Sequence, residues 1–154
     1  MPSVLLPVPL YSQSRPGACL PACACMVLAY FGHTISEQSV GRLLGTRHAG
    51  TPVPNITRLR SIGLSVRYEA LTEYDLQLQL QAQHPLICRL WTVMLDYWPT
   101  DTPHAAVVIG YDDQHVYLND PAFPDAPQRV LWAGFLAAWE EYDRMAAIIQ
   151  PPPQ

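Results

Sequence analysis

Cys19 is the residue of this sequence whose position best suits a chemical role. Four cysteines are present, at positions 19, 23, 25 and 88. Cys19 follows the turn-like segment 15–18, where an apolar helix is predicted to begin. The unpaired amides at a helix start carry partial positive charge, which lowers the pKa of a thiol and favours the nucleophilic thiolate. Cys23, Cys25 and Cys88 lack that help, and we interpret them as packing residues.

A thiolate nucleophile needs a base, and histidine is the usual one. The chain has five histidines, which are His33, His48, His84, His104 and His115. His104 differs from the others because it opens the most apolar run of the chain, residues 105–110, which is predicted to form a central strand. A rigid strand suits a catalytic group. We interpret the other four histidines as surface residues.

Asp120 is placed to orient the imidazole of His104. The runs 105–111 and 116–118 predict two antiparallel strands joined by a turn near Asp113. Such a hairpin brings Asp120, just after the second strand, beside the start of the first. A carboxylate there would hold the imidazole in the required tautomer. Asn-Asp-Pro is also a common turn sequence, but the hairpin geometry favours the catalytic interpretation.

Gln13 precedes Cys19 in the loop that leads into the predicted helix. Its side-chain amide could donate a hydrogen bond to a developing oxyanion, beside the backbone N–H of Cys19. A metal site built from Cys19, Cys23, Cys25 and a histidine is disfavoured, because zinc sites prefer a Cys-x-x-Cys knuckle that this sequence lacks.

The first half of the chain is predicted to be mainly helical. The elements are helices over 19–31, over 36–44 and from just after Asn55, as N-cap, to near Gly63, followed by a strand over 64–71. Thr72 and Asp75 form a capping-box pair that opens a further helix to about residue 83. The helix over 19–31 is the strongest of these predictions, and it would hold Cys19 at its first residue.

The second half is predicted to be mainly extended. Its strands are 86–91, 105–111, 116–118, 129–132 and 145–149, with one helix over 133–141. A connection over 92–103 carries Tyr97 and Trp98. Helices that precede an antiparallel sheet are the α+β pattern.

Length and composition predict one domain over 1–150 with a disordered tail at 151–154. The net charge of −4 gives no reason to expect nucleic acid or an anionic membrane as a partner. All nine basic residues are arginine, which excludes Schiff-base lysine chemistry. No secretory signal and no apolar run of membrane-spanning length is visible, so we expect a cytoplasmic protein with no membrane segment.

The segment 13–32 resembles the opening of the double-glycine peptidase family. These are papain-like cysteine peptidases, best known as the leader-cleaving domains of bacteriocin exporters. The sequence Cys19-Leu20-Pro21-Ala22 corresponds to the family's Cys-Gly-Pro-Ala. The runs 104–112 and 116–122 are similar to the family's catalytic histidine strand and to its catalytic aspartate segment. The likeness covers residues 8–149.

The resemblance implies a papain-like fold in which N-terminal helices pack on a C-terminal antiparallel sheet. It also implies roles for four residues, with Cys19 as nucleophile, His104 as base, Asp120 as orienting residue and Gln13 as oxyanion donor. The implied reaction is hydrolysis of a peptide bond after a small-residue pair, typically Gly-Gly, without cofactor or metal. Leu20 replaces the family's glycine, and its bulk would reshape the cleft beside the thiol.

The expected substrate is a peptide or a flexible protein segment, held extended in a groove. Leu20, Tyr97 and Trp98 are the candidate substrate-binding residues, although the two aromatic residues would equally suit a partly buried cluster. Two alternatives use the same fold. One is a peptide-binding module of weak catalytic activity, which Leu20 favours. The other is an acyltransferase, in which an amine replaces water at the thioester.

Overall fold

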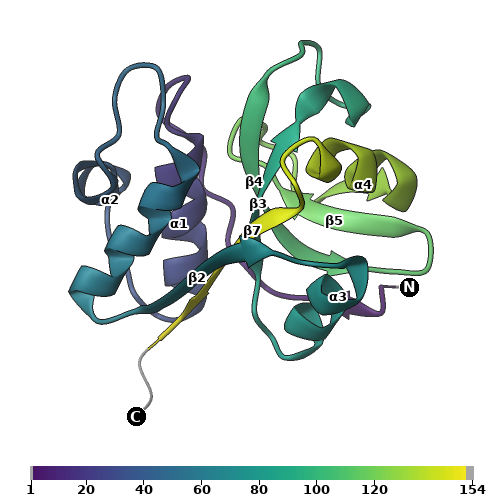
Figure 1. The fold of residues 1–154 in the computed structure, drawn as a ribbon, viewed down its shortest axis with the longest axis horizontal. Helices are drawn as coiled ribbons and strands as arrows, with labels where there is room; N and C mark the ends of the chain where they lie inside the picture. Colours follow the sequence, from purple (N-terminus) through teal and green to yellow (C-terminus); the bar gives the residue numbers. More distant parts are fainter. Residues whose placement is uncertain (1, 152–154) are drawn as a thin grey trace.

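Residues 2–151 are described by a computed structural model, in which the strands form one seven-stranded antiparallel sheet (Figure 1). The strand order is β2-β7-β3-β4-β5-β6, and β1 pairs with β4. The strands are β1 (Val4–Leu5), β2 (Ser65–Ala70), β3 (Leu86–Trp91), β4 (Pro103–Tyr111), β5 (His115–Asn119), β6 (Gln128–Leu131) and β7 (Met145–Gln150). Every pairing is antiparallel, as the α+β prediction requires.

Helices lie on both sides of this sheet. The α-helices are α1 (Cys19–Tyr30), α2 (Glu37–Leu44), α3 (Glu73–Gln81) and α4 (Trp132–Glu140), and the 3₁₀ helices are η1 (Val53–Ile62) and η2 (Thr92–Met94). In Figure 1, α1 and α2 lie to one side and α3 and α4 to the other. The molecule therefore has a helical half, built mainly from the first third of the chain, and a sheet half.

Helix α1 is buried because its residues are apolar on every side. Residues 20–28 are all buried, and the helix packs against α2 and against β4. A helix that is apolar all round belongs in a protein core. The predicted start at Cys19 is confirmed, and the N-cap residue Ala18 offers no side-chain hydrogen bond to the first turn. The thiol of Cys19 therefore has no competing capping group beside it.

Strand β4 is central, with β3 on one side and β5 on the other. Its residues 104–111 are buried. The strand begins earlier than the predicted residue 105, which places His104 inside the ladder, opposite Leu90 of β3. Near its other end, a side chain at Gly110 would collide with the backbone carbonyl of Val4, so the absence of a side chain there lets β1 pair with β4.

The hairpin between β4 and β5 forms as predicted. The carboxylate of Asp112 accepts hydrogen bonds from the backbone N–H groups of Gln114 and His115, at 2.7 Å and 2.6 Å. In the paired strands Val107 lies opposite Asn119. Asp120, the next residue, therefore lies beside the first part of β4.

Two further predictions about where helices begin can be compared with the structure. The capping box of Thr72 and Asp75 at the start of α3 is confirmed. The predicted start of the third helix after Asn55 is wrong, because η1 begins at Val53 and is a 3₁₀ helix. Proline suits a first helical turn, and Pro54 lies in the first turn of η1. The side chain of Asn55 instead donates to the carbonyl of Leu44, at 3.0 Å.

The predicted tail begins at Pro151, and its residues 152–154 lie outside the described part of the chain. Within residues 2–151, no helix combines the length and the apolar character needed to cross a membrane.

Candidate active site

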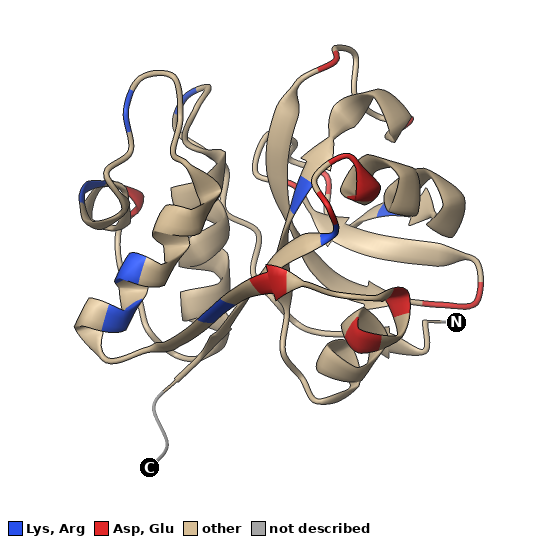
Figure 2. Ribbon diagram, in the orientation of Figure 1, with Lys and Arg blue, Asp and Glu red and all other residues tan. Residues whose placement is uncertain are grey.

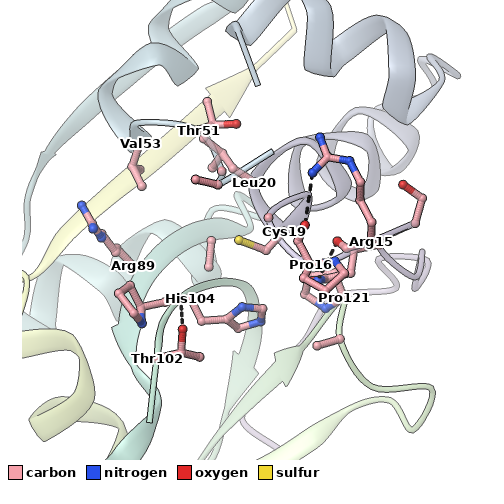
Figure 3. A pocket seen from close by; sticks show the side chains of 18 of the residues that line it. Arg15, Pro16, Cys19, Leu20, Thr51, Val53, Arg89, Thr102, His104 and Pro121 are labelled. Carbon is pink, nitrogen blue, oxygen red and sulfur yellow. Dashed lines mark hydrogen bonds between the residues drawn. The ribbon is translucent and has the colours of Figure 1, made fainter. Parts of the chain in front are cut away.

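A cleft of about 980 Å³ lies where the start of α1 faces β3 and β4 (Figure 3). The loop before η1 and the segment after β5 complete its walls. Its lining includes Gln13, Cys19, Leu20, Arg89, Trp98 and His104. The cleft thus joins residues that are far apart in the sequence.

Cys19 is the first residue of α1, and its thiol is partly buried in the cleft. Burial raises the pKa of the Cys19 thiol, but the hydrogen-bonding and electrostatic influence of His104 opposes this. The backbone groups of Ala105 and Leu20 add to the influence of His104, and the net effect lowers the pKa below its ordinary value. The thiolate, which is the nucleophilic form, is thereby favoured.

His104 and Asp120 form a buried pair. The Nε2 atom of His104 lies 2.7 Å from Oδ1 of Asp120, and the two residues are only 6% and 0% exposed. Burial lowers the pKa of His104, but the hydrogen bonds to Asp120 and Cys19 outweigh it and raise the pKa to about 9. With Nε2 occupied by the carboxylate, Nδ1 is the ring nitrogen left to exchange a proton with the Cys19 sulfur.

The carboxylate of Asp120 is hydrogen-bonded at both oxygens. Besides His104, Oδ1 accepts from the backbone N–H of Ala122, at 2.9 Å. The other oxygen, Oδ2, accepts from the Tyr97 hydroxyl at 2.7 Å and from the Trp98 indole N–H at 2.9 Å. Burial alone raises the pKa of the Asp120 carboxyl, but the influence of His104, then of Tyr97 and Ala122, lowers it below its ordinary value. The carboxylate is therefore held both charged and oriented.

Tyr97 and Trp98 differ in their relation to the cleft, although both contact Asp120. Trp98 lines the cleft and stacks edge-on against the His104 imidazole, with ring centroids 4.6 Å apart. Tyr97 is directed at Asp120 and is not one of the residues that line the cleft. Both side chains therefore act as supports for the His104–Asp120 pair. Nothing in the sequence of the 92–103 connection indicates which acceptor they would find.

Gln13 lines the cleft, and its backbone N–H donates to the carbonyl of Pro121 at 2.8 Å. Its side-chain Nε2 donates to the carbonyl of Arg15 at 3.1 Å. Its Oε1 is buried and has no hydrogen-bond partner among the described residues. The Nε2 group carries two N–H donors, so one of them stays free for an oxyanion while the other is used by the Arg15 carbonyl.

Leu20 lines the cleft but is only 1% exposed, so most of its side chain packs in the core. The leucine that replaces the family's glycine is thus accommodated by packing.

The other three thiols differ sharply from Cys19 in their pKa values. Burial raises the pKa of Cys25 to about 11, and it raises the pKa values of Cys23 and Cys88 as well. Cys19 is the one cysteine in residues 2–151 whose thiolate is favoured.

No group of three or more His, Cys, Asp or Glu side chains in residues 2–151 is arranged to hold a metal ion.

Replacing Tyr97 with phenylalanine is expected to lower the free energy of unfolding by about 1.5–3 kcal/mol, because a hydrogen bond to a buried carboxylate is lost. The pKa of Asp120 is lowered on folding, so its contribution is complete above the ordinary value of 3.8 and disappears as pH falls through the folded-state pKa. The effect of the substitution should therefore shrink in acid. Denaturant unfolding at several pH values measures it.

Tyr74→Phe is the matched control, since Tyr74 is 68% exposed on α3. Equal effects of the two substitutions, or an effect of Tyr97→Phe that is independent of pH, would show that the hydroxyl does not stabilise the carboxylate.

The fold and this cleft together define the class of protein. Helices followed by an antiparallel sheet, with a cysteine at a helix start facing a histidine on a strand, are the architecture of papain-like cysteine peptidases. The sequence matches the model of the Peptidase_C39 like family over residues 5–147. The chain belongs to this family. No curated protein matches the chain significantly.

Solved structures agree with this assignment. A C39-like protein from Bacillus anthracis superposes with a TM-score of 0.80 at 18% identity, covering 100% of both chains. A double glycine motif protease from the AMS/PCAT transporter, solved with its leader peptide, gives 0.74 at 20% identity, covering 97% of this chain and 95% of the other. The peptidase domain of Streptococcus ComA gives 0.75 at 20% identity, covering 92% and 97%. At these identities the likeness establishes the fold, and it confirms the predicted α+β, papain-like class.

Proposed function

We propose that this protein is a cysteine peptidase that hydrolyses a peptide bond in a peptide or in a flexible protein segment. The observation that carries the proposal is the geometry around His104. One ring nitrogen is held by Asp120 at 2.7 Å, and the imidazole lowers the pKa of the Cys19 thiol across the cleft. A thiolate paired with an oriented imidazolium is the arrangement that nucleophilic peptide hydrolysis needs.

In the first half of the reaction, the Cys19 sulfur attacks the carbonyl carbon of the scissile bond. A C–S bond forms while the carbonyl oxygen takes up negative charge. The imidazolium of His104 then gives its proton to the departing amine, the C–N bond breaks, and a thioester remains on Cys19. Asp120 stabilises the imidazolium and keeps its tautomer throughout.

In the second half, His104 acts as a base. It removes a proton from water, whose oxygen attacks the thioester carbonyl, and the C–S bond breaks to release the new carboxyl terminus. In each tetrahedral intermediate the oxyanion needs donors. We propose the backbone N–H of Cys19 and the side-chain amide of Gln13, which lines the same cleft, for this role.

The proposed substrate is an extended segment cut after small residues, of the Gly-Gly kind. The double glycine motif protease among the structural neighbours was solved with a leader peptide, which supports a peptide substrate for this fold. Leu20 and Trp98 would contact the substrate beside the thiol, since both line the cleft. The preference for small residues is the one that the resemblance to the double-glycine peptidases implies.

We expect the protein to cleave a peptide with a central Gly-Gly pair at least about tenfold faster than one with Leu-Leu at the same place, because a packed pocket rejects added methylene groups. Mass spectrometry of the products locates the cut. The Cys19→Ala variant is the control for contaminating peptidases. Equal cleavage of both peptides would contradict the small-residue preference.

Two alternatives use the same fold. The first is a peptide-binding module with weak hydrolysis, in which one of the two Gln13 amide donors stays on the Arg15 carbonyl. Binding of the Gly-Gly peptide without cleavage by the unmodified protein would select it. Acyl transfer uses the same thioester, and an added amine that replaces water in the product would identify it.

A further inference from the structure

Arg89 lies in the cleft and has no acidic partner. It is on β3 and lines the cleft with Cys19 and His104 (Figure 3). Among residues 2–151, no carboxylate forms an ion pair or hydrogen bond with its guanidinium. A cation that is partly removed from water normally has a counter-charge. The guanidinium of Arg89 is therefore free to pair with a carboxylate of a ligand.

The guanidinium of Arg89 is nevertheless held in place. Its Cζ atom lies 4.2 Å from the ring centroid of Tyr142, which is a cation–π contact. Such a contact uses the flat face of the guanidinium and leaves the N–H groups at its edge free. Those groups match a carboxylate, to which arginine can donate two parallel hydrogen bonds. Because the side chain is already positioned, little conformational entropy is lost when a carboxylate binds.

The charge of the cleft agrees with this reading. The chain carries 13 acidic residues and a net charge of −4, yet no acidic residue lines the cleft. Its lining includes Arg15, Arg89, His48 and His104. Figure 2 shows that the basic segments gather mainly over the helical half and the acidic ones over the sheet half. Arg15 uses its guanidinium on backbone carbonyls, including those of Arg47 and His48, so Arg89 is the cation left for a ligand.

Arg89 lies on the strand beside the one that carries His104. In the β3–β4 ladder Arg89 is opposite Ala105, so these two side chains share a face, while His104, one residue earlier, is opposite Leu90. Neighbouring strands are roughly 5 Å apart. Because Arg89, Cys19 and His104 line one cleft, a carboxylate bound by Arg89 belongs to a substrate residue within a few positions of the bond facing Cys19.

We propose that Arg89 is a specificity residue that binds a carboxylate of the peptide substrate, so that the cleft selects segments with an acidic residue close to the scissile bond. This inference rests on the proposed function, because it assigns a specificity for the peptide that the protein would cleave. The experiment below measures peptide binding and does not require cleavage. The same chemistry could be offered by a free carboxyl terminus, and the peptides below separate the two sources.

Binding is measured with the Cys19→Ala protein, which cannot cleave. Fluorescein-labelled peptides of about twelve residues, roughly 40 Å when extended, carry a central Gly-Gly pair and an amidated carboxyl terminus. Glutamate is placed in turn at each position near the pair, and glutamine at the same position gives the neutral match. We expect the best glutamate peptide to bind about tenfold more tightly than its glutamine match, as measured by fluorescence anisotropy.

Variants assign the preference to Arg89. In the Cys19→Ala protein, adding Arg89→Met should bring the ratio of the affinities for the glutamate and glutamine peptides close to one. Arg89→Lys should retain part of the preference for glutamate, because the positive charge remains. Arg67→Gln is the matched control, since Arg67 already pairs with Glu69 at 2.7 Å and does not line the cleft. It should leave the ratio unchanged. Thermal unfolding of each variant checks that the fold is retained.

A glutamate-to-glutamine ratio near one at every position, or a preference that survives Arg89→Met, would overturn the inference. A glutamine peptide with a free carboxyl terminus in place of the amide tests the other source of a carboxylate. If this is the only peptide that binds more tightly, Arg89 binds the carboxyl terminus and the side-chain assignment is overturned. Failure of the unmodified protein to cleave peptides that the Cys19→Ala variant binds with this preference would instead reject hydrolysis and leave Arg89 as the carboxylate site.

Discussion

Replacing Cys19 with serine is expected to lower kcat for peptide hydrolysis by on the order of 10⁴-fold or more, since loss of a nucleophile is among the largest effects in triad enzymes. A serine hydroxyl has a far higher pKa than a thiol, and this site is built to favour a thiolate by a lowered pKa. The measurement is single-turnover cleavage of the Gly-Gly peptide. Far-UV circular dichroism should be unchanged, because the substitution is nearly isosteric.

Cys25→Ser is the matched control, since Cys25 lies on the same helix but is buried, with its thiol 3.3 Å from the carbonyl of Ile35. Its pKa is raised to about 11, so it is not a nucleophile at neutral pH. We expect kcat to be unaffected in this variant. If activity is retained in Cys19→Ser and lost in Cys25→Ser, the nucleophile is Cys25 and not Cys19.

Replacing His104 with alanine is expected to reduce kcat about 10²- to 10⁴-fold, the range for a general acid–base residue. It should also change the reactivity of Cys19. Without the imidazole, burial becomes the main influence on the thiol and raises its pKa. Alkylation of Cys19 by iodoacetamide at pH 7, followed by mass spectrometry, should therefore slow by at least about tenfold.

The pH dependence has a definite sign. In the unmodified protein the pKa of Cys19 is lowered and that of His104 is raised to about 9, so the thiolate–imidazolium pair exists between those two values. Hydrolysis should rise as Cys19 loses its proton and fall as pH passes about 9, where His104 loses its own. Alkylation has no such fall, and the rates of the two proteins should converge at high pH.

His33→Ala is the control for this experiment, because His33 is exposed after α1 and lies outside the cleft. It should leave both the alkylation rate and the hydrolysis profile unchanged. If Cys19 in the unmodified protein reacts no faster at pH 7 than it does in His104→Ala, the thiolate is not stabilised by the imidazole, and the peptide-binding alternative takes precedence.

The predictions that agree with the structure depend on signals between neighbours in the chain. The start of α1 at Cys19 follows from the apolar run behind it and the turn-like residues before it. The approach of Asp120 to His104 follows from a short hairpin whose turn Asp112 closes. The misplaced start of the third helix is instructive, because Asn55 is a good N-cap residue by type but bonds a carbonyl of α2. A contact between separate segments there outweighs the local preference.

The amino-acid sequence by itself therefore determined the order of elements, the residue types of the proposed site and the hairpin that pairs two of them, because helix starts and tight turns are set over a few residues. Only the tertiary structure decided that Tyr97 and Trp98 hold the Asp120 carboxylate, that Gln13 donates to Arg15, and that Arg89 lies in the cleft with no carboxylate partner among residues 2–151. The partner of a polar side chain depends on which segments pack against it. That packing is settled by burial of the whole apolar core, whose contributions come from residues far apart in the chain.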